Sequence, residues 1–74
     1  MTDRAEDARD RCLRNAEFSA KRAVELRGLQ LTCADGDIAS AYGRIAEATE
    51  TFGKEMFYCA QQMTIALNKD DNLE

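Results

Sequence analysis

The chain has 74 residues, a net charge of −4 and an apolar content of 45%, but 12 of its 33 apolar residues are alanines. A domain this small is marginal, and alanine buries little area, so the composition excludes a self-sufficient large core. Residues 1–74 are therefore expected to form one domain that self-associates.

Residue types that are rare or missing narrow the fold and the location. The chain has no proline, three cysteines and no histidine. A lack of proline suits long helices, and three cysteines without histidine make a poor zinc set, so we expect no metal and no cofactor. Every apolar run is too short for a membrane span, and the N-terminus lacks a signal peptide's apolar region. We therefore expect a cytoplasmic protein that has no membrane contact.

The first predicted element is a helix over about residues 4–32. Small residues recur on one of its faces, flanked by a shoulder of Leu13, Val24 and Leu31. The small-residue stripe is Ala5, Ala8, Cys12, Ala16, Ser19, Ala20 and Ala23.

A turn is expected over residues 33–37. Gly36 suits the left-handed conformation that ends a helix, and Asp37 or Asp35 suits the N-cap of the next helix. A short loop of this kind makes the two flanking helices antiparallel, and facing residue numbers then sum to about 71. Cys12 would face Cys59, and both are expected to be reduced thiols because helices usually pack too far apart for a disulfide.

The second helix is predicted over about residues 38–68, followed by a frayed tail at 69–74. Two sets of residues recur every seven positions, which is the pattern of a helix packed along a partner helix. The first set is Ile38, Ile45, Phe52, Cys59 and Ala66, and the second is Tyr42, Thr49, Met56 and Met63. Thr49 is expected to hydrogen-bond back to its own helix.

A further row of small residues makes this apolar stripe wider than one partner helix can cover. The row and its flank consist of Ala39, Ala46, Gly53, Phe57 and Ala60. We expect these residues to form a homodimer interface, which predicts an all-α fold in which two antiparallel hairpins make a four-helix bundle. The alternative is that the row only fills grooves beneath the shoulder of the first helix.

Catalysis has little support in the sequence. No histidine is present to act as a base near neutral pH, and no glycine-rich phosphate loop follows a strand. Paired carboxylates such as Glu47 and Glu50 are typical of a solvated helix surface. We therefore expect neither an enzyme nor a small-molecule substrate.

A ridge of apolar and basic residues lies opposite the alanine stripe on the first helix. Its members are Arg4, Arg11, Phe18, Arg22 and Leu29, with Arg14 at its edge. The residues expected to bind a partner are Arg11, Arg14, Phe18, Arg22 and Leu29. Aromatic residues and arginine dominate binding hot spots, although isolated exposed apolar residues are also common on soluble proteins. The ridge favours a regulator that binds a larger protein and acts by occlusion, as adaptors, anti-activators and small phage inhibitors do. A structural assembly subunit is a further alternative.

The layout also resembles the Rop family of plasmid copy-number regulators, which are dimers of helical hairpins with an acidic turn and a polar tail. In that family, the first helix carries a phenylalanine flanked by basic and amide side chains that contact paired RNA loops. Phe18 with Arg11, Arg14 and Arg22 is similar in kind, so the resemblance implies RNA as an alternative partner. Basic residues are concentrated in the first helix: the net charge of residues 1–34 is +1, whereas that of residues 35–74 is −5.

Overall fold

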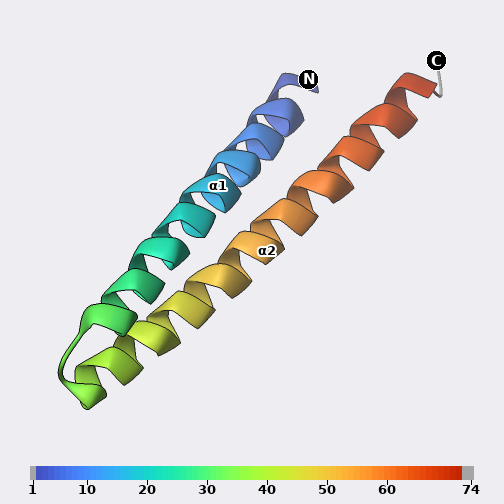
Figure 1. The fold of residues 1–74 in the computed structure, drawn as a ribbon. Helices are drawn as coiled ribbons and strands as arrows, with labels where there is room; N and C mark the ends of the chain where they lie inside the picture. Colours follow the sequence, from blue (N-terminus) through green and yellow to red (C-terminus); the bar gives the residue numbers. More distant parts are fainter. Residues whose placement is uncertain (1, 73–74) are drawn as a thin grey trace.

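Two long helices run antiparallel and make up nearly the whole chain. A computed structural model describes the backbone of residues 2–72 and the side chains of residues 4–69. Helix α1 spans Thr2–Thr32 and helix α2 spans Gly36–Asn72. Both termini lie at the same end of a molecule 60 × 14 × 12 Å in size (Figure 1). The predicted all-α helical hairpin is confirmed.

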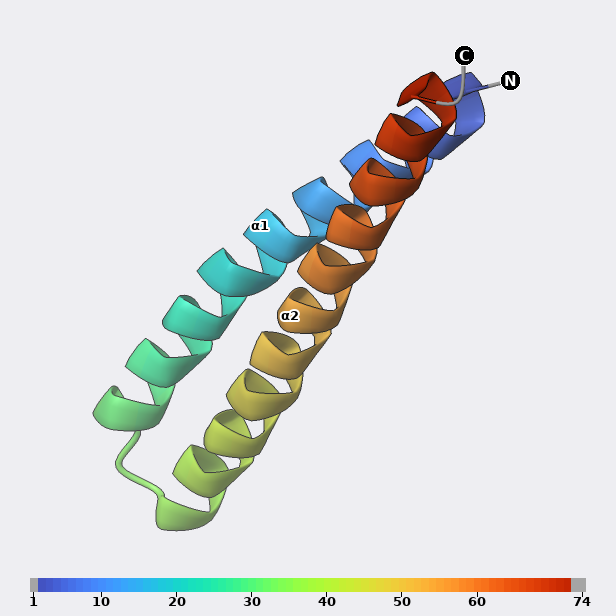
Figure 2. The same cartoon turned by 90° about the vertical axis from the view of Figure 1, so that its right-hand side faces the viewer.

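Both helices are longer than the sequence predicted. Helix α1 begins at Thr2, and α2 extends from Gly36 to Asn72, so the part of the expected tail up to Asn72 is helical. The end of that tail, residues 73–74, lies outside the described residues. The two helices twist around each other, as the views in Figures 1 and 2 show together. Within the described residues, no helix is both long and apolar enough to cross a membrane.

Asp35 shapes the turn between the helices. Its Oδ1 accepts hydrogen bonds from the backbone N–H groups of Asp37 at 2.9 Å and Ile38 at 3.1 Å, which makes Asp35 the N-cap of α2. Asp37 lies in the first turn of α2, where its negative charge interacts favourably with the positive end of the helix dipole. The left-handed conformation expected for Gly36 is wrong: none of the described residues has a positive φ, and Gly36 is already the first residue of α2.

The contact between the helices is built from small side chains. Among the described side chains the buried ones are Ser19, Ala23, Leu26, Ala46 and Ala60, and Leu26 is the only large one. Gly53 lies opposite Ser19, since a Cβ built on Gly53 would be 3.1 Å from the Ser19 Cβ. This pairing and the contact of Gly43 with Gln30 agree with the predicted register to within about two residues.

The small-residue face predicted on α1 is largely confirmed. Ser19 and Ala23 are buried, and Ala5, Ala8, Cys12 and Ala16 are partly buried, whereas Ala20 is exposed. In the shoulder, Val24 and Leu31 are largely exposed, whereas Leu13 is 36% exposed and lines a small pocket with Ala60 and Ile65 of α2. The three cysteines are free thiols, each partly buried. The back-bond of Thr49 is also confirmed, because its hydroxyl donates to the carbonyl of Ile45 at 2.8 Å.

The rows of α2 that face α1 agree only in part with the prediction. In the second predicted set, Tyr42, Thr49, Met56 and Met63 are each partly buried, but in the first set Ile38, Ile45 and Phe52 remain half exposed. Ala46 and Ala60, which are buried, and Ala39 and Gly53, which are partly buried, face α1 in their place. The contact is displaced by one residue around α2, because two small-residue faces can approach more closely than a small face and a large one. Ala46 and Ala60 of the expected dimer interface are buried within the hairpin, and Gly53 packs opposite Ser19, which agrees with the alternative that this row packs beneath the first helix. Ala39 is partly buried. Phe57, the fifth expected interface residue, is half exposed.

Candidate interaction surfaces

Most of the large apolar side chains lie on the surface of the hairpin. At least a third of the side chain is exposed in eleven of them: Leu13, Phe18, Val24, Leu29, Leu31, Ile38, Ile45, Phe52, Phe57, Tyr58 and Ile65. Scattered exposed apolar residues are ordinary on soluble proteins. Eleven on a 74-residue chain, however, are more apolar side chains than two helices can bury between them. The surface of the hairpin is therefore where its interactions are to be found.

The exposed residues divide between two sides of the hairpin. Gly53 faces α1, and its chain neighbours Phe52 and Lys54 project about 100° to either side of it. On α1, Ser19 faces inward in the same way, between Phe18 and Ala20. Lys54 and Ala20 line one groove together, so Phe18 and Phe52 share the opposite side.

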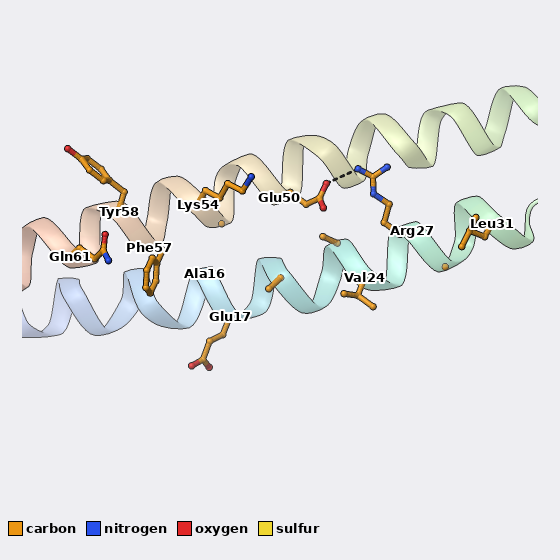
Figure 3. Close-up of a pocket in the computed structure, with 14 residues that line it drawn as sticks. Ala16, Glu17, Val24, Arg27, Leu31, Glu50, Lys54, Phe57, Tyr58 and Gln61 are labelled. Carbon is orange, nitrogen blue, oxygen red and sulfur yellow. Dashed lines mark hydrogen bonds and ion pairs between the residues drawn. The ribbon is translucent and has the colours of Figure 1, made fainter.

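The groove has a volume of about 940 Å³ and runs between the two helices. Small residues, among them Ala16, Ala20 and Gly53, form its floor. Figure 3 shows Phe57 lying across the gap between the ribbons, with Val24 and Leu31 further along α1. The groove is apolar at its floor and open to solvent.

Charged and polar residues border this groove. Arg27 on α1 and Glu50 on α2 form an ion pair with an N–O distance of 2.8 Å, which bridges the two helices (Figure 3). Lys54 and Gln61 extend the polar border along α2, and Glu17 points away from the groove on α1. Both partners of the ion pair are nearly half exposed, so the pair contributes at most about 1 kcal/mol.

The opposite side carries an uncharged surface on α2, here called the α2 stripe. Its residues lie on three adjacent sevenfold rows. They are Ile38, Ala41, Tyr42, Ile45, Ala48, Thr49, Phe52, Met56, Cys59, Met63 and Ala66. None of them is fully buried, although Tyr42, Thr49, Met56, Cys59 and Met63 are partly buried. Glu55 and Gln62, on the outermost of the rows, lie at its edge.

The residues that the sequence predicted to bind a partner lie on α1, beside the α2 stripe. Phe18 is 69% exposed, Leu29 is partly exposed, and Arg11, Arg14 and Arg22 are all exposed. Arg22 forms an ion pair with Glu25 one turn along the helix, at 3.0 Å. These five residues, here called the Phe18 ridge, are therefore accessible, as the sequence predicted.

Sequence reasoning missed two features of these surfaces. The first is the burial of Leu26. Leu26 continues the sevenfold spacing of Ala5, Cys12 and Ser19, and this spacing could have shown that its side chain packs inward. The groove depends on Ala16 and Ala20 of α1 lying on the same side of the hairpin as the groove-lining face of Gly53. Periodicity in either helix alone does not indicate it, because the groove forms only when the two faces are paired.

No protein-family model matches this chain, and neither a curated protein nor a solved structure shows significant similarity to it. Within the part of the chain that the structure describes, no three His, Cys, Asp or Glu residues are grouped so that they could hold a metal ion.

Proposed function

We propose that this protein is a non-catalytic, cytoplasmic regulator that self-associates into a four-helix bundle and binds a larger protein through a helix face. The observation that carries the proposal is the ratio of exposed to buried apolar side chains. Leu26 is the only large side chain buried among those described, whereas eleven are exposed. A hairpin with so little core needs cover from other chains, and a rigid bundle can then occlude a partner's surface.

The Phe18 ridge is the proposed contact with the larger protein. Phe18 is the most exposed aromatic residue among those described, and exposed arginines lie about one turn to either side of it. An aromatic ring that fills a pocket, with arginines paired to acidic groups around it, is the usual composition of a binding hot spot. The ion pair of Arg22 with Glu25 is weak because both side chains are exposed, so a partner's carboxylate can replace Glu25.

Phe18→Ala is expected to weaken binding of the larger protein by about 2 kcal/mol or more, because it removes the central anchor. The measurement is a pull-down from a lysate of the source organism with the wild type and the variant, followed by titration of the captured protein. Val24→Ala is the matched control, since Val24 is 72% exposed on the groove side. Binding that survives Phe18→Ala and is lost with Val24→Ala would place the partner in the groove and contradict the proposal. Loss of helicity in Phe18→Ala would instead show that Phe18 belongs to the core.

RNA is a second candidate partner, favoured by the same exposed ring among Arg11, Arg14 and Arg22. Arginines that neutralise phosphates release counterions, so affinity for an RNA stem-loop pair is expected to fall steeply as salt rises. Three phosphate contacts give a slope of roughly −3 in a plot of log affinity against log salt. The test is a fluorescence titration of labelled RNA over a range of salt concentrations, with a nuclease-treated arm in the pull-down. A flat response removes RNA as the ligand.

A further inference from the structure

The α2 stripe is a long, continuous surface that has no charged residue among its members. It runs from Ile38 to Ala66, which is about 42 Å at the rise of an α-helix, in a molecule 60 Å long. Ile38, Ile45 and Phe52 are each about half exposed along it. The groove on the other side differs because Arg27, Glu50 and Lys54 border it.

The stripe is complementary to itself when two copies run antiparallel. If the two-fold axis passes near Phe52, at the middle of the stripe, Ile45 lies opposite Cys59 of the second copy and Ile38 lies opposite Ala66. On the adjoining rows, Ala48 meets Met56 and Ala41 meets Met63, while Glu55 and Gln62 lie opposite Thr49 and Tyr42. Each of the four apolar pairs joins a larger side chain to a smaller one, which is how facing helices interdigitate without voids. At the axis itself, Phe52 lies opposite Phe52 of the second copy.

The area of the stripe also suits a second copy. At about 200 Å² for each large side chain, the half-exposed Ile38, Ile45 and Phe52 offer roughly 300 Å². The eight smaller or less exposed members bring the total to roughly 600 Å², and a specific interface needs about 800 Å² per partner. Leu29 and the adjacent flank of α1 on the same side can supply the remainder.

We infer that the α2 stripe is the seam of an antiparallel dimer, in which α2 packs against α2 of a second copy with the two-fold axis near Phe52. This inference rests on the self-association proposed above and specifies the surface that performs it. The seam leaves the groove on the outside of the dimer. Leu29 of the Phe18 ridge lies at the border of the seam. Phe18 and the three ridge arginines of each copy stay at the edge formed by the α1 helices, where a larger protein can reach them.

Ile45→Glu tests the seam, because it places a charge in the proposed contact of both copies. The dimer dissociation constant, measured by sedimentation equilibrium, is expected to rise by about 100-fold or more. Val24→Glu is the matched control on the groove side and is expected to leave the dimer intact. If the Val24→Glu variant dissociates and the Ile45→Glu variant stays dimeric, the proposed seam is wrong, although the protein still self-associates. A wild-type monomer would overturn both.

A cross-link tests the seam in a dimer that carries no added charge. The variant combines Ile45→Cys with Cys12→Ser and Cys33→Ser, so that Cys59 is the only native thiol left. Positions 45 and 59 of one helix are about 21 Å apart, so a short bifunctional thiol reagent can join them only between copies. Trypsin cleavage after Arg44 and Lys54 separates the two positions, and mass spectrometry identifies the joined peptides.

The antiparallel seam predicts a cross-link between position 45 of one copy and Cys59 of the other. Cross-links that join 45 to 45 and 59 to 59 would show a parallel pairing and overturn the proposed axis. A dimer that forms no cross-link would show that the stripe is not the contact. The corresponding variant with Val24→Cys in place of Ile45→Cys is the negative control, because Val24 lies on the opposite side.

Discussion

Leu26→Ala is expected to destabilise the folded protein by about 2–5 kcal/mol, more than any other Leu→Ala change in the described part of the chain. Leu26 is 4% exposed and, among the side chains that the structure describes, is the one large side chain that the two helices bury between them. Its neighbours on the inner faces are mostly alanine, glycine and serine, which cannot fill the space that a truncated leucine leaves. The measurement is chemical unfolding followed by circular dichroism at a fixed protein concentration.

The control for this variant is Leu31→Ala on the same helix. Leu31 is 86% exposed, so the same change in chemistry removes almost no buried area, and its effect is expected to stay within about 0.5 kcal/mol. Equal losses of stability in the two variants would contradict the packing described here. A larger loss in Leu31→Ala would show that the groove side, rather than the contact between α1 and α2, holds the core.

Gly53→Leu and Gly28→Leu are expected to change stability in opposite directions. A Cβ on Gly53 would be 3.1 Å from the Ser19 Cβ and 3.6 Å from the Ala16 carbonyl oxygen, so a leucine side chain there has to push the helices apart. We expect a loss of about 1–3 kcal/mol. A Cβ on Gly28 meets nothing within 4 Å, so leucine there gains about 0.8 kcal/mol from its higher helix propensity.

Thermal unfolding of the two glycine variants, measured at the same concentration as the wild type, is the check. The signs matter more than the sizes, because both substitutions raise helix propensity and only the surroundings differ. Stabilisation by Gly53→Leu would mean that α1 does not approach α2 closely at Ser19. The row that faces α1 would then have to be assigned again.

The sequence was sufficient for the hairpin itself. Alanine spacing in residues 4–32, the aspartates of the turn and the sevenfold rows after Ile38 each favour the same antiparallel arrangement. The back-bond of Thr49 was also predicted, and Asp35 was one of the two aspartates expected to cap the second helix, because both features depend only on neighbours within four residues. Local hydrogen-bonding chemistry is well determined by local sequence.

The choice of contacting row was not determined in the same way. Ile38, Ile45 and Phe52 precede Ala39, Ala46 and Gly53 by one residue each, so both rows repeat at seven and differ by only about 100° around the helix. The row of Ile38, Ile45 and Phe52 has larger side chains and therefore more apolar area to bury. For that reason the sequence predicted it as the contact with the first helix. The structure selects the smaller row because the facing surface of α1 is small too.

This selection connects the fold to the proposed function. Two small faces form a close contact but a thin core, and the larger apolar residues of both helices are left on the outside. The accessibility of Phe18 was predicted because it lies opposite the alanine stripe. The sharing of one side by Phe18 and the α2 stripe was not, because it depends on how the two helices are rotated against each other.

The central claim is that one hairpin does not fold stably on its own. Sedimentation equilibrium and circular dichroism over the same dilution series, from high micromolar to nanomolar protein, test it directly. We expect a dimer with full helicity at the top of the range, and helicity that falls together with the dimer on dilution. A monomer that keeps its full helicity throughout the micromolar range would contradict the claim.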